Sequence, residues 1–170
     1  LFATISGGWW HSKNLADWRF IKPDVAPLAW PKEDMCAPAA ISVGGKVYLF
    51  QSTFERRPIW VTSDPASGRL TQFNPLLPPL PGAAGPWDPA FFHDDDTDRW
   101  FLYFGSSNLY PLYGIELDFT NRLSYVGTAR ELITLHPEQH GWERFGRDHR
   151  GDVKPFIEGA KKTGLVALEG

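Results

Sequence analysis

Short apolar runs separated by turn residues make up most of this chain. Residues 46–50, 58–62, 100–104 and 113–117 are rich in aromatic and β-branched side chains, which is typical of strands. Gly44-Gly45, Asp64-Pro65 and Ser67-Gly68 mark turns between such runs. Only residues 129–135 show a pattern that favours a helix. The pattern therefore predicts an all-β fold.

The strand pattern recurs along the chain. Trp60 follows Trp10 by 50 residues, and Tyr113 follows Trp60 by 53. Each of the three begins a strand that runs into a polar turn and then an outer strand, at residues 18–21, 70–73 and 123–126. A period near 50 favours the blades of a β-propeller. A β-sandwich remains the alternative, which explains the strands but not the period. The units we expect are 1–30, 36–75 and 87–130.

Composition narrows the classes of partner. Aromatic residues make up 15%, including 8 Trp and 12 Phe, more than core filling requires. The net charge of -3 argues against nucleic acid, and no apolar run is long enough for a membrane span. Cys36 is the only cysteine, so an internal disulfide is excluded. Residues 1–4 resemble a strand already under way, and we expect the chain to begin inside a larger protein.

Two carboxylates stand in apolar surroundings. Asp88 lies between Trp87 and Pro89, just before one predicted strand, and Glu158 follows Phe156-Ile157. Two such groups on a β scaffold suggest acid/base work on a glycosidic bond. The alternative is that Asp88 caps a turn and Glu158 is solvated. The acidic run 94–98 lacks the glycine and distal glutamate of a calcium loop, and the five histidines show no zinc-ligand spacing, so no metal site is predicted.

Several segments, in order, resemble glycoside hydrolase family 43. They are WHSKNLADW at 10–18, APA at 37–39 with GKVYLF at 45–50, WDPAFFHDDD at 87–96, YGIEL at 113–117, HGWERFG at 140–146 and KPFIEGA at 154–160. The resemblance implies a five-bladed β-propeller, of which this chain holds about three blades and the start of a further one at 154–170. It also implies an inverting β-xylosidase or α-L-arabinofuranosidase that acts on xylose- or arabinose-containing plant polysaccharides or oligosaccharides, as in xylan degradation.

By this resemblance, Glu158 is the general acid and Asp88 modulates its pKa. Desolvation by Phe156 and Ile157, and repulsion by an ionised Asp88, would raise the pKa of Glu158. Glu169 is a second candidate acid. The family's general base lies in a segment that would precede Leu1, so we assign no base and expect the isolated chain to be inactive.

Flat apolar faces and polar rim groups would bind the sugar. The candidates are Trp9, Trp10, Trp30, Trp87, Asn108, Tyr110 and Arg144. Packing between blades is the alternative for the tryptophans, and a solvated charge is the alternative for Arg144. Cys36 stands where the family often has tryptophan.

The expected partner is an oligosaccharide or polysaccharide, with no nucleic acid and no membrane. We expect self-association through open blade edges. No cofactor is required, although the resemblance is compatible with a structural calcium ion. We expect the parent protein to be secreted or periplasmic in a bacterium. A non-catalytic carbohydrate-binding propeller, and a propeller that binds other proteins, remain alternative functions.

Overall fold

The protein is all-β in the computed structural model, which describes residues 1–25, 36–52, 58–74, 80–83, 88–105, 111–120, 122–134, 136 and 139–140. Within these residues there are ten strands and no helix, and hence no helix that could cross a membrane. The strands are β1 (Trp9–His11), β2 (Arg19–Ile21), β3 (Cys36–Val43), β4 (Lys46–Ser52), β5 (Ile59–Thr62), β6 (Thr71–Asn74), β7 (Ala90–Asp94), β8 (Arg99–Phe104), β9 (Leu112–Asp118) and β10 (Ser124–Ile133).

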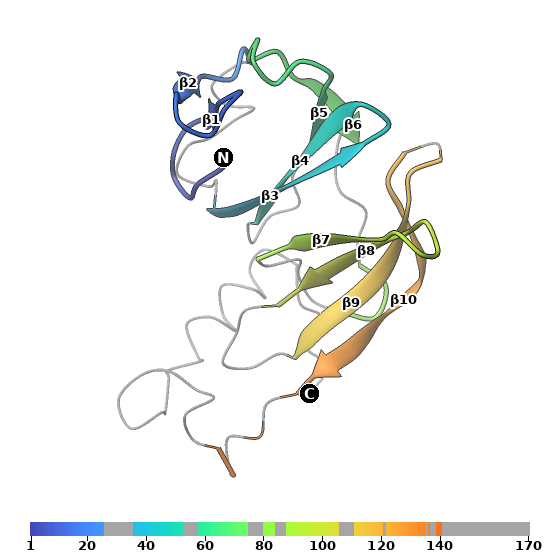
Figure 1. The fold of residues 1–170 in the computed structure, drawn as a ribbon. Coiled ribbons are helices and arrows are strands. Elements are labelled where there is room, and N and C mark those ends of the chain that lie inside the picture. The colour runs from blue at the N-terminus through green and yellow to red at the C-terminus, as the bar shows by residue number, and fades with distance from the viewer. Residues whose placement is uncertain are drawn as a thin grey trace.

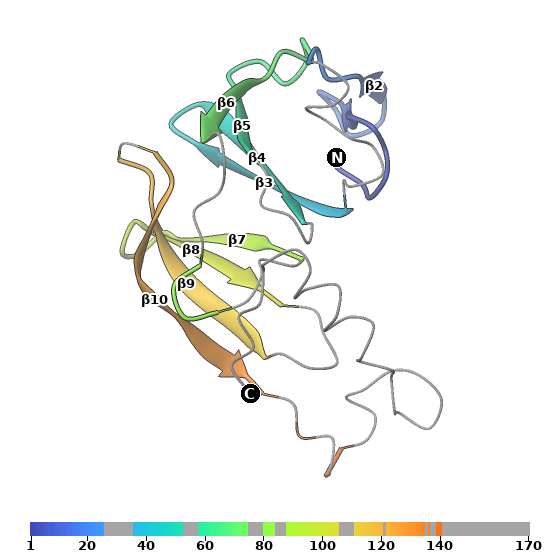
Figure 2. The ribbon, with the colours of Figure 1, turned by 180° about the vertical axis from the view of Figure 1, so that it is seen from behind.

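The strands form three antiparallel sheets in which chain neighbours pair. β1 and β2 form a two-stranded sheet, and the two other sheets have the orders β3-β4-β5-β6 and β7-β8-β9-β10 (Figure 1). The four-stranded sheets span residues 36–74 and 90–133. Their first strands, β3 and β7, contact each other. Figure 2 shows the same neighbouring placement of the two sheets from behind.

The middle sheet, β3–β6, has core side chains on both faces. Tyr48 and Phe50 of β4 belong to a core shared with Leu102, Phe104 and other residues of the β7–β10 sheet. Leu49, between them in sequence, belongs to a second core with Trp9 and Ile21 of the β1–β2 sheet. Because side chains alternate across a strand, consecutive residues of β4 serve different interfaces. This explains why residues 47–50 of β4 are apolar without a break.

A buried asparagine joins the two large sheets. Asn74, at the end of β6, is 5% exposed. Its side-chain amide donates to the carbonyl oxygen of Leu123 at 3.2 Å, and its side-chain oxygen accepts from the Leu123 N–H, also at 3.2 Å. A buried polar group is stable only when it is paired, so this reciprocal pair fixes how the sheets sit against each other.

An Asx turn follows the strand that opens each predicted repeat. The side-chain oxygens of Asn14, Asp64 and Asp118 each accept from the backbone N–H two residues further on, at 3.0, 3.1 and 2.7 Å. Aspartate and asparagine favour turns because their side chains can replace a backbone acceptor in this way. The three sheets therefore share this turn.

Two predictions of local structure were wrong. Residues 129–133, expected in a helix, belong to β10, where Arg130 pairs with Gly114 and Glu131 pairs with Tyr113. The weak helical pattern is overridden by pairing with the edge of β9. The expected strand at residues 1–4 is reduced to a single bridge between Phe2 and Trp9, because the chain turns at Thr4 and Ile5.

Candidate functional site

Asp88 lies immediately before β7, the first strand of its sheet. Its φ is 44°, in the left-handed region, and its side chain is exposed while Pro89 is buried. Aspartate tolerates this conformation better than most residues, yet it remains uncommon outside glycine. Such backbone outliers cluster at functional sites because the surrounding fold must hold them in place. Ile5, Leu15, Ala37 and Asp98 also have a positive φ, so the backbone alone does not distinguish Asp88, and its catalytic role stays a prediction.

The middle sheet contains a matching turn without the carboxylate. Ala37-Pro38-Ala39 begins β3 as Asp88-Pro89-Ala90 leads into β7, and Ala37 also has a positive φ, of 35°. The Ala37 N–H donates to Oγ1 of Thr4 at 3.1 Å. The repeat therefore presents the same backbone turn twice, with a methyl group in one sheet and a carboxylate in the other.

The loop after β8 belongs to the same end of its sheet as Asp88. Ala90 pairs with Tyr103, and Phe104 pairs with Tyr113, so the end of β8 and the start of β9 lie beside the start of β7. Gly105 has a φ of 129°, and a Cβ there would lie 2.7 Å from the Pro111 carbonyl oxygen. Only glycine fits this approach. Asn108 and Tyr110 occur between these strands in sequence, but both fall outside the described residues.

Most of the remaining predicted site residues also fall outside the described part of the chain. These are Glu158, Trp30, Trp87 and Arg144, together with the alternative acid Glu169. The meeting of Asp88 and Glu158 across one cavity therefore stays a prediction.

The two adjacent tryptophans of β1 have different surroundings. Trp9 is 1% exposed, packs with Leu49 and Trp60, and donates from Nε1 to the Pro65 carbonyl oxygen at 2.8 Å. Its ring has no face open to a sugar, so Trp9 has the packing role that was the alternative. Trp10 is half-buried, with its ring edge-on to Phe20 at 5.0 Å. Trp10 stays a candidate for sugar stacking.

A histidine that we did not single out organises the acidic turn after β7. His93 Nδ1 is 2.8 Å from Asp95, its Nε2 is 2.9 Å from Asp98, and its ring stacks on Trp100 at 4.0 Å. The hydrogen bond to Asp98, and then that to Asp95, raises the pKa of His93 above its usual range. This turn lies at the end of β7 opposite Asp88. No group of three or more potential metal ligands occurs in the described residues.

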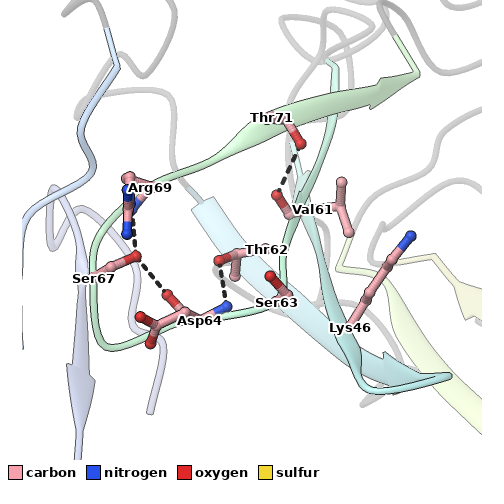
Figure 3. A pocket seen from close by; sticks show the side chains of 8 residues that line it. All are labelled: Lys46, Val61, Thr62, Ser63, Asp64, Ser67, Arg69 and Thr71. Atoms are coloured by element: carbon pink, nitrogen blue, oxygen red, sulfur yellow. Dashed lines mark hydrogen bonds between the residues drawn. The ribbon is translucent and has the colours of Figure 1, made fainter.

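Two cavities lie at that opposite end of the sheets. One, of about 260 Å³, surrounds the end of β5 (Figure 3). It is lined by Lys46, Val61, Thr62, Ser63, Asp64, Ser67, Arg69 and Thr71. A second, of about 360 Å³, surrounds the end of β9 and is lined by Asp98, Arg99, Trp100, Glu116, Leu117, Asp118, Phe119, Thr120 and Val126. Neither contains Asp88, so both are distinct from the predicted catalytic position.

The comparison with solved structures gives a likeness in fold. A structure described as "Glycoside hydrolase" aligns with a TM-score of 0.51 and 20% sequence identity. The alignment covers 75% of this chain and 29% of that chain, so this chain spans less than a third of the other protein's length. No protein-family model matches the sequence. No curated protein matches it either.

Proposed function

We propose that this chain is part of a glycoside hydrolase that acts on xylose- or arabinose-containing plant saccharides. The observation that carries the proposal is the carboxylate of Asp88, held in a left-handed turn at the start of the first strand of its sheet. The fold likeness to a glycoside hydrolase supports the class of enzyme. The sequence motifs that resemble family 43 support the choice of sugar.

The proposed fold is a five-bladed β-propeller in which each four-stranded sheet is one blade. Three observations support it: β3 and β7 contact each other, chain neighbours pair within every sheet, and the middle sheet packs against a different sheet on each face. Blades of a propeller stack in this way around an axis lined by their first strands. Asp88 would then stand near that axis.

The proposed mechanism is hydrolysis with inversion. Glu158 protonates the leaving oxygen, while a base that we do not assign activates water on the opposite face of the sugar. An ionised Asp88 nearby would raise the pKa of Glu158 by repulsion and so keep the acid protonated. In this role Asp88 acts through Glu158 and does not itself transfer the proton.

Hydrolysis of aryl xylosides, aryl arabinofuranosides and natural xylo-oligosaccharides by the complete parent protein tests the proposal. Glu158→Gln is expected to reduce turnover of the natural substrates about 10²–10⁴-fold, with a smaller loss on aryl glycosides, whose leaving groups need little protonation. Asp88→Asn should shift the pH profile, which a merely structural role would leave in place. Asp95→Asn, beyond the other end of β7, is the matched control and should leave both the turnover and the pH profile unchanged.

The second candidate is a non-catalytic carbohydrate-binding propeller. It is favoured by two cavities at the sheet ends opposite Asp88, one at the end of β5 and one at the end of β9. Calorimetry with the same oligosaccharides separates the two functions. Binding without hydrolysis supports the second candidate, and the absence of both overturns the assignment to carbohydrates.

A further inference from the structure

The two cavities occupy corresponding places in the two large sheets. Val47 pairs with Thr62 as Trp100 pairs with Leu117, and Val61 pairs with Thr71 as Glu116 pairs with Val126. These pairings place Lys46 in correspondence with Arg99, and Val61 in correspondence with Glu116. The two cavities therefore occupy the same structural position in their sheets but are lined by different side chains.

In the β7–β10 sheet the positive charge at this position is neutralised by a glutamate of the same sheet. Arg99 Nε donates to Glu116 Oε1 at 2.8 Å, and Arg99 Nη2 donates to Glu116 Oε2. The two hydrogen bonds raise the pKa of Arg99 and lower that of Glu116. The cavity is lined by one cation and three carboxylates, so it would repel an anion.

In the middle sheet the same position lacks the internal counter-ion. Val61 replaces the glutamate, and within the described residues Lys46 and the Arg69 guanidinium make no ion pair or hydrogen bond. The lining holds two cations and one carboxylate, Asp64. Figure 3 shows Ser63 between Lys46, on one side of the β5 end, and Asp64 and Arg69 on the other.

Some polar groups of this cavity already make hydrogen bonds within the protein, and others are available to a ligand. Thr62 Oγ1 accepts from the Asp64 N–H at 3.0 Å, and Ser67 Oγ donates to the Asp64 carbonyl oxygen at 2.8 Å. Asp64 Oδ1 accepts from the Ala66 N–H, which leaves Oδ2 as an acceptor. The available groups are thus two cations, the Ser63 hydroxyl and one carboxylate oxygen.

We propose that this cavity binds an acidic sugar unit, with a uronate carboxylate at Lys46 and sugar hydroxyls at Ser63, Asp64 and Arg69. An excess of one positive charge suits a monoanion, and the remaining carboxylate oxygen suits a hydroxyl donor. The cavity volume of about 260 Å³ suits one sugar ring rather than a chain. The choice of a sugar rests on the proposed function, whereas the preference for an anion rests on the cavity alone.

Both cations are exposed, so binding is expected to be weak and to depend on salt. The test is a titration of the ¹⁵N-labelled full chain with sodium glucuronate, followed by NMR. We expect a Kd on the order of 1 mM, with shifts confined to residues 46 and 61–71. Glucose and sodium chloride at the same ionic strength should leave these signals in place. Inorganic phosphate should bind more weakly, because it offers no hydroxyl donors of a sugar ring.

Variants make the test specific. Lys46→Met should weaken glucuronate binding about two- to fivefold, the range expected for one exposed ion pair, whereas Lys13→Met removes a positive charge that does not line the cavity and should have no effect. Val61→Glu supplies the missing counter-ion and should suppress binding. If Val61→Glu fails to fold, the comparison of Lys46→Met with Lys13→Met decides.

Three results would overturn the inference: no localised shifts, equal effects of Lys46→Met and Lys13→Met, or phosphate binding as tightly as glucuronate. The last would mark a general oxyanion site. The titration reports on residues at the sheet end opposite Asp88. It therefore fails or succeeds independently of hydrolysis, and loss of activity in Asp88 variants leaves its outcome unchanged.

Discussion

Replacing Leu102 with alanine tests the packing between the two large sheets. Leu102 is 0% exposed and lies in the core that residues of both sheets share. Leu102→Ala removes buried methyl groups and leaves a cavity, because β8 is held by β7 and β9 and cannot close the space. Substitutions of this kind cost about 2–5 kcal/mol, and the complete burial of Leu102 suggests about 3 kcal/mol.

The free energy of unfolding can be measured by urea and thermal denaturation of the full chain. A loss of about 3 kcal/mol should lower Tm by roughly 6–12 °C in a chain of this size. Leu132→Ala is the matched control, because Leu132 is 53% exposed and should change stability by less than about 0.5 kcal/mol. Equal losses for the two leucines would show that the packing of the β7–β10 sheet against the middle sheet is misplaced.

Three further predictions address other contacts. Asn74→Ala leaves the buried N–H and C=O of Leu123 without their partner and should cost about 1–3 kcal/mol in urea denaturation, so a neutral result would contradict the role of Asn74 in joining the sheets. Gly68→Ala adds a Cβ 2.5 Å from the Lys22 carbonyl oxygen at a φ of +80°, and should lower Tm more than Gly44→Ala, where a Cβ meets nothing within 4 Å. Because the pKa of His93 is raised in the fold, its pairs with Asp98 and Asp95 should stabilise the protein fully below about pH 6.5 and lose their effect as pH rises through the folded-state pKa. His93→Phe should therefore lower Tm at acidic pH and approach the parent protein at alkaline pH, and a difference in Tm that grows with pH would refute this.

The strands could be predicted because their signals are local. Residues 46–50, 100–104 and 113–117 all lie in strands, since their aromatic and β-branched side chains fit a buried sheet. The period of about 50 anticipated the recurring order of strands. Residues 129–133 were mistaken for helix because their place is set by pairing with β9, which no local pattern reveals. Asp64 was used as a turn signal together with Pro65, whereas the matching Asx turns at Asn14 and Asp118 were a readable signal that we did not use.

The candidate site could be predicted only in part. The Asp-Pro pair identified the position before β7, but the left-handed backbone of Asp88 depends on the fold and not on the sequence alone. Trp9 was expected at a sugar, although its burial depends on Leu49 and Trp60, which lie about 40 and 50 residues further on. The correspondence of Lys46 with Arg99 required the register of the strands, so the cavity at β5 emerged only from the structure.

The alternating faces of β4 have a consequence for how this protein unfolds. Tyr48 and Phe50 hold one neighbouring sheet while Leu49 holds the other, so the middle sheet has two interfaces and each outer sheet described here has one. When sheets stack in a row, the energy of each depends on its own strands and on its nearest neighbours. The outer sheets should therefore exchange their amide hydrogens first, and the β3–β6 sheet should open last. The order in which the sheets open would then follow from the alternation of side chains along β4.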